Sequence, residues 1–159
     1  MTRLARTIRF DDSDERVFAR AAGPGEWAIP GGFEFSNWSD ADLTGKARQA
    51  FANGWLSLDG FGRATLVAVA QIEPAERAAL VERLATHFVE VWGAPSADAA
   101  RPTAEAEIAF MEDLVADHPP NTLLTVSREL TGSGVRESFR AITPAEAEID
   151  IVAIHGTAD

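Results

Sequence analysis

The stretch Thr122–Ile142, read TLLTVSRELTGSGVRESFRAI, contains the clearest structural pattern in this chain. It contains two runs rich in β-branched and apolar residues, at 122–130 and 135–142, which are typical of strands. Between them stands Thr131-Gly132-Ser133-Gly134, a set of residues that favours a tight turn. The stretch therefore predicts a C-terminal β-hairpin over residues 122–142 with a four-residue loop.

The register of this hairpin follows from its apolar residues, which place Val126 opposite Phe139. The same register sets Arg128 directly across from Glu137, on the face that these apolar residues form. Two charges on an apolar face must be paired if they are buried. We predict a cross-strand ion pair, and the sequence leaves open that Arg128 and Glu137 instead anchor an anionic ligand or a partner.

Working outward from the hairpin, two helical patterns precede it. Apolar residues recur at helical spacing over about 74–92 and again over about 103–118, and the segment 94–102 between them is small and polar, as in a loop. The preceding stretch 61–72 is apolar at nearly every position, which favours a strand buried on both faces or a strand buried at a contact with a partner. Together these patterns predict an α+β fold, an antiparallel sheet packed by two main helices.

The N-terminal part predicts further elements. Leu4–Phe10 alternates like a strand, Asp11–Asp14 is turn chemistry, and Arg16–Ala22 completes an expected hairpin. Ala41–Phe51 predicts a short helix. At the other end, residues 144–155 fit either a helix or a strand.

Composition limits the classes of function. A chain of 159 residues with net charge −11 suits a single domain over 1–159, and it offers no basic cluster for nucleic acid or an anionic membrane. The charge leaves open a basic protein surface as the partner, and the alternative is that it only keeps the protein soluble. Cysteine is absent, no apolar run approaches the length of a membrane span, and the N-terminus has no signal-peptide pattern, so we expect a cytoplasmic protein.

We identify no catalytic residue, metal site or cofactor motif in the sequence. The three histidines, His87, His118 and His155, share no ligand spacing, and no phosphate-binding glycine loop or nucleophile elbow occurs. We therefore expect no metal and no cofactor.

An aromatic segment over residues 27–61 holds three of the four tryptophans among many glycines. Loops carry function more often than the elements they join, and aromatic residues dominate interface hot spots. Trp27, Phe33 and Trp38 are therefore the candidate contact residues. The alternative, that these rings fill a second layer of core, stays open.

Two family resemblances arise. Trp27-Ala28-Ile29-Pro30-Gly31-Gly32 resembles the opening of Nudix hydrolases, but the acidic cluster that such enzymes need is missing at 49–54, which reads QAFANG. Four motifs look like those of a small bacterial family of unknown function: LARTIRF at 4–10, RVF at 16–18, GEWAIPGGF at 25–33 and GKARQAF at 45–51. That resemblance implies one cytosolic domain and assigns no catalytic residue.

These observations favour a non-catalytic interaction or accessory protein, one that could assist a larger enzyme or form a homodimer. A protein partner or self-association is expected, and neither nucleic acid nor membrane. The alternative is a small-ligand-binding domain or enzyme with a pocket between the aromatic segment and the sheet.

Overall fold

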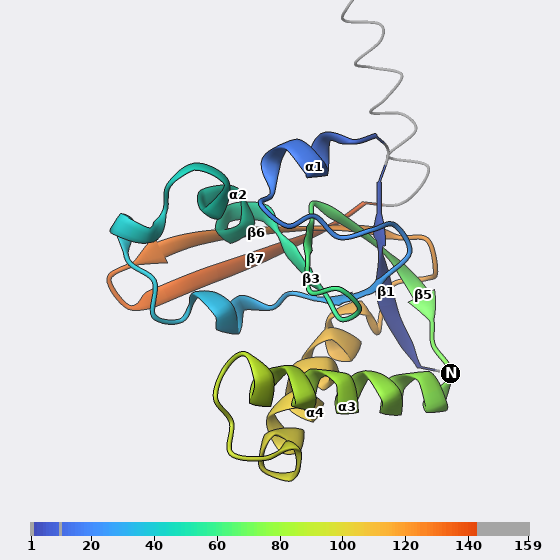
Figure 1. Ribbon diagram of the computed structural model, residues 1–159. Helices are drawn as coiled ribbons and strands as arrows, with labels where there is room; N and C mark the ends of the chain where they lie inside the picture. Colours follow the sequence, from blue (N-terminus) through green and yellow to red (C-terminus); the bar gives the residue numbers. More distant parts are fainter. Residues whose placement is uncertain (1, 10, 143–159) are drawn as a thin grey trace, which may run out of the picture.

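Seven strands form one antiparallel sheet in the computed structural model, which describes residues 2–9 and 11–142 (Figure 1). Their order across the sheet is β4-β3-β2-β1-β5-β6-β7. The strands are β1 (Arg3–Ile8), β2 (Trp27–Ile29), β3 (Trp55–Ser57), β4 (Arg63–Ala64), β5 (Leu66–Gln71), β6 (Leu123–Thr131) and β7 (Gly134–Ile142). The predicted α+β class and antiparallel sheet are confirmed.

Two long helices, α3 (Pro74–Glu90) and α4 (Ala97–Val115), pack against each other and lie together below the sheet in Figure 1. Above it lie α1 (Ser13–Val17) and α2 (Gly45–Asn53), and two 3₁₀ helices, η1 (Gly32–Phe35) and η2 (Asp40–Asp42), connect β2 to α2. The core joins the sheet to the two long helices. Its fully buried side chains include Trp55, Leu56, Val67, Leu84, Ile108 and Met111.

The C-terminal hairpin has the predicted register. Arg128 pairs with Glu137 and Val126 with Phe139 across β6 and β7. The strands run on to Thr131 and Gly134, so the connecting turn is two residues long and not four. The stretch 61–72 contains two strands, β4 and β5, and not the single strand predicted. β5 lies between β1 and β6 with Val67, Ala68 and Val69 all buried, as expected of a strand covered on both faces.

The second main helix begins six residues earlier than predicted. Ser96 caps α4 by accepting a hydrogen bond from the Ala99 amide at 3.1 Å, and Pro102 lies inside the helix. The loop predicted over 94–102 from its small and polar residues is therefore wrong from Ala97 onward, although proline has no amide hydrogen to donate and normally breaks a helix. Surrounding alanines, the strongest helix formers, carry the helix through Pro102.

The predicted N-terminal hairpin is wrong. Residues 16–22 form no strand, and Ser13–Val17 is the short helix α1, whose first turn carries Asp14 and Glu15, favourable at the positive end of a helix. Asp14 is buried and accepts a hydrogen bond from the Thr65 hydroxyl at 2.7 Å, which ties α1 to the sheet. β1 pairs instead with β2 and β5.

The predicted helix over Ala41–Phe51 exists but is shifted, because α2 covers Gly45–Asn53 and η2 precedes it. Residues 144–155, for which the sequence fits a helix or a strand, lie outside the described residues. His155 is among them.

Candidate functional site

The predicted pair of Arg128 and Glu137 is present. The Arg128 Nε donates to a Glu137 carboxylate oxygen at 2.7 Å, and the exposed fractions of the two side chains are 0% and 24%. Arg128 also donates to the main-chain carbonyls of Phe51 at 3.0 Å, Gly54 at 2.9 Å and Pro30. Nearly all of its N–H groups thus have partners within the protein, which leaves this guanidinium little capacity for a ligand.

A second buried arginine, Arg63 on β4, shares two of these partners, the carbonyls of Pro30 and Gly54. Its guanidinium donates to the carbonyls of Pro30 at 3.1 Å, Gly54 at 3.0 Å and Gly31 at 3.1 Å, and it pairs with Glu34 of η1. The sequence analysis missed Arg63. Its only sequence signal is a charge at the start of an apolar run, which is more often an exposed strand end.

The ring of Phe35 is in contact with both guanidinium groups. The Cζ atoms of Arg63 and Arg128 lie 4.6 Å and 5.1 Å from its centroid. Cations over aromatic faces are attracted by the ring quadrupole, more strongly where water is excluded. Phe35 therefore helps to hold two like charges close together in the interior.

Burial lowers the pKa of Arg63 to about 10, and the neighbouring Glu34 carboxylate opposes that shift. Burial also lowers the pKa of Arg128, against the effect of Glu137. Both arginines are nevertheless cations at pH 7. With two carboxylates beside them, the charges of this cluster balance, and the cluster fixes the segment from Pro30 to Glu34 against β4 and β6.

The turn that enters η1 requires glycine. Gly31 has φ +67°, and a Cβ atom there would lie 2.5 Å from the Leu56 Cβ. At Gly32 a Cβ atom would lie 2.6 Å from a Glu137 carboxylate oxygen. The backbone of this turn can therefore approach both the core and the ion pair only because side chains are absent.

A recess of about 490 Å³ opens where η1, α4 and β7 meet. Its lining includes Gly32 and Phe33, then Glu107 and Phe110 of α4, and Val135 and Glu137 of β7. We call it the acidic recess. It lies between the aromatic segment and the sheet, and α4 forms part of its lining.

Glu107 is the unusual group in the acidic recess. It is half-buried and forms no ion pair or side-chain hydrogen bond with any described residue. Burial raises its pKa, and the charge of Glu137 raises it further. The pKa of Glu107 is higher in the folded chain than in the unfolded one. Its contribution to the stability of the fold is therefore fully present at low pH. That stability is lost as pH rises through the folded pKa. Ionisation of Glu107 therefore lowers the stability of the fold.

The three aromatic candidates lie in different places. Trp27 is 9% exposed, belongs to the core and lines neither the acidic recess nor the second recess described below. Phe33 is half-buried in the acidic recess and packs edge-on against Phe88 and Trp92, with centroids 5.0 Å and 5.9 Å away. Trp38 is half-buried and packs edge-on against Phe35, with centroids 4.8 Å apart.

The described histidines have separate surroundings. His87 stacks on Phe61 with centroids 3.7 Å apart, and burial lowers its pKa, so its ring is neutral at pH 7. His118 follows α4, and its main-chain carbonyl accepts a hydrogen bond from Arg3 at 2.7 Å. Within residues 2–9 and 11–142, no three His, Asp or Glu side chains gather closely enough to hold a metal ion.

No helix in the described part of the chain is both long and apolar enough to span a membrane.

The chain belongs to a family of unknown function, DUF6505, whose model matches residues 1–159. This confirms the resemblance to an uncharacterised family. Neither the curated proteins nor the solved structures include a match to the chain. Family membership therefore assigns no activity to the recess, and its function has to be argued from its geometry.

Proposed function

We propose that this protein is a non-catalytic cytoplasmic interaction protein, an accessory to a larger enzyme, that receives a basic side chain of a partner protein in the acidic recess. The single observation that carries the proposal is Glu107, a half-buried carboxylate without a partner among the described residues. A group that destabilises the free protein is expected where binding supplies the missing interaction.

The charges around the recess favour a cation. Arg63 and Arg128 are balanced by Glu34 and Glu137, so Glu107 adds one negative charge that nothing in the described residues offsets. The net charge of −11 would also steer a basic surface toward the molecule.

The aromatic rings of the recess favour a side chain that is both cationic and flat. Phe110 is 48% exposed and lines the recess together with Phe33. An arginine guanidinium can stack on such rings while it forms two hydrogen bonds to a carboxylate, and a lysine ammonium can do neither as well. Arginine is therefore the expected anchor of the partner.

A second copy of this chain is the other partner that we consider. β7 is an edge strand of the described sheet over nine residues and could pair with a second copy. Its exposed face carries Arg136 and Arg140, and charges on an edge strand discourage such pairing. This favours the recess over the strand edge as the contact.

A small cationic molecule is the second candidate for the recess. The volume of about 490 Å³ is within the range of small-ligand sites, which supports the alternative of a ligand-binding pocket between the aromatic segment and the sheet. A peptide partner and a small amine would bind the same carboxylate, so the chemistry of the site does not distinguish them. Capture of a protein partner does.

We expect Glu107→Gln to abolish partner capture without unfolding the protein. Tagged wild-type protein, Glu107→Gln and Phe110→Ala would be expressed in the native cell and their bound proteins quantified by mass spectrometry. Recovery should fall about tenfold or more for both variants, because each removes one side of the anchor site. At pH 7 the unfolding midpoint of Glu107→Gln should be at least that of wild type, since the amide removes a destabilising charge.

Asp113→Asn is the matched control, because Asp113 is exposed on the same helix and the substitution removes the same charge. It should retain the partner. If all three variants capture the wild-type set of proteins equally, the acidic recess is not the contact.

A further inference from the structure

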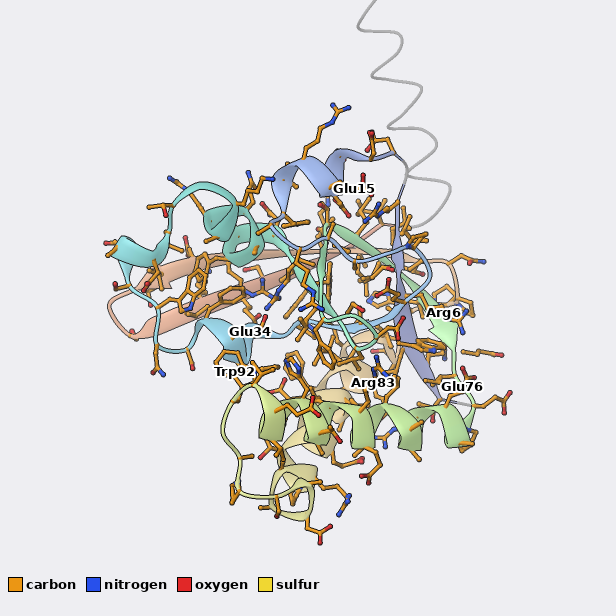
Figure 2. All side chains as sticks on the ribbon, in the orientation of Figure 1. Arg6, Glu15, Glu34, Glu76, Arg83 and Trp92 are labelled. Atoms are coloured by element: carbon orange, nitrogen blue, oxygen red, sulfur yellow. The ribbon has the colours of Figure 1, made fainter. Side chains whose placement is uncertain are left out.

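A second recess, of about 300 Å³, has the opposite charge. Its lining includes Arg20, Lys46, Arg63, Phe35, Trp38 and Trp92, and we call it the basic recess. η1 separates it from the acidic recess, since Phe33 lines the acidic recess and Glu34 lines the basic one. Figure 2 shows Glu34 and Trp92 next to each other beside the end of α3.

Two cations of the basic recess have no carboxylate partner within residues 2–9 and 11–142. Nine arginines of this chain form ion pairs, among them Arg63 with Glu34. Arg20 and Lys46 pair with no described residue, although the chain has 25 acidic residues to 14 basic ones. Two spare positive charges in one recess of so acidic a protein indicate a site for an anion.

The same recess offers exposed aromatic surface. Trp92 is 47% exposed and Trp38 half-buried, and both line it. Flat rings present their faces to other flat rings, which adds to the free energy of burial. The first turn of α2 contributes Lys46 and Ala47 to the lining and contains no acidic residue, so its positive end adds to the local potential.

We propose that the basic recess binds a small planar aromatic molecule that carries one carboxylate or phosphate group. The ring packs against Trp38 and Trp92, and the anionic group meets Arg20 and Lys46. A cavity of about 300 Å³ accommodates one or two fused rings. An aromatic acid and a nucleoside monophosphate share this chemistry. The proposal does not depend on the function of the acidic recess.

Calorimetric titration with two matched probe pairs tests the proposal. The first pair is 2-naphthoate and its neutral amide, and the second is adenosine 5′-monophosphate and adenosine. We expect at least one anion to bind, and its neutral counterpart to bind about tenfold more weakly or worse. Binding of 2-naphthoate alone identifies an aromatic acid as the ligand class, and binding of the nucleotide alone identifies a nucleotide.

Lys46→Gln and Arg20→Gln should each weaken binding of the anion about tenfold. Arg48→Gln is the matched control, since Arg48 lies in α2, has no ion pair with a described residue and does not line the recess. Arg48→Gln should leave the affinity unchanged. The proposal is overturned if neither anion binds at about 1 mM, a free energy near −4 kcal/mol. Equal binding of the neutral probes, or equal weakening by Arg48→Gln, would also overturn it.

Discussion

Arg128→Met is expected to lower the free energy of unfolding by about 3–5 kcal/mol. The guanidinium of Arg128 is fully buried and donates to the carbonyls of Pro30, Phe51 and Gly54 as well as to Glu137. Methionine fills a similar volume but supplies no donor, so several buried acceptors would lose their hydrogen bonds at once.

Urea unfolding of a small set of variants would measure this effect and assign its cause. Arg128→Lys keeps the charge but not the forked donors, and it should still cost more than about 2 kcal/mol, because one ammonium cannot reach all of these carbonyls. Arg136→Met is the control on the same hairpin, since Arg136 is 70% exposed and its loss should change stability by about 0.5 kcal/mol or less. A cost below about 1 kcal/mol for Arg128→Met would show that the cluster does not hold the segment in place.

Trp27→Ala is expected to cost about 3–5 kcal/mol, the usual range for a buried tryptophan. Trp27 is 9% exposed in β2, and the Arg6 guanidinium lies 4.1 Å above its ring. Arg6 in turn lies near Glu76 of α3, with an N–O distance of 3.9 Å (Figure 2). Removal of the ring would leave a cavity in the core, and the Arg6 guanidinium would lose its contact with the indole face.

Trp38→Ala provides the contrast for thermal unfolding. Trp38 is half-buried at the edge of the basic recess, so its removal should cost about 1–2 kcal/mol. Equal and large destabilisation by both substitutions would assign both rings to the core. Equal and small effects would instead show that Trp27 is a surface contact.

The hairpin could be predicted from the sequence because two independent patterns agreed. The apolar row that contains Val126 and Phe139 and the charged pair of Arg128 and Glu137 require the same register. Other elements depended on tertiary contacts that no local pattern contains. α1 is held by a hydrogen bond from Thr65 to Asp14, fifty-one residues apart, and α4 continues through Pro102 against local expectation.

The candidate site could be predicted only in part, for the same reason. Glu137 and Phe33 stood out in their own segments, one as a charge on an apolar strand face and the other as a ring in an aromatic loop. Glu107 did not, because a glutamate on an acidic helix is usually solvated. It becomes a candidate only when the fold brings α4 against η1 and β7, three segments that are distant in sequence.

The proposed binding site depends on Glu107 as a carboxylate that binds a cation of the partner. The most direct measurement is a pH titration of Glu107. NMR of its side-chain carboxyl carbon would monitor the titration in free protein and in the presence of acetyl-Gly-Arg-Gly-amide. The citrulline version of the peptide, which has no charge, is the control. We predict a pKa of Glu107 above the ordinary glutamate value in the free protein, and a lower pKa with the arginine peptide only. An ordinary pKa of Glu107 that neither peptide changes would contradict the account.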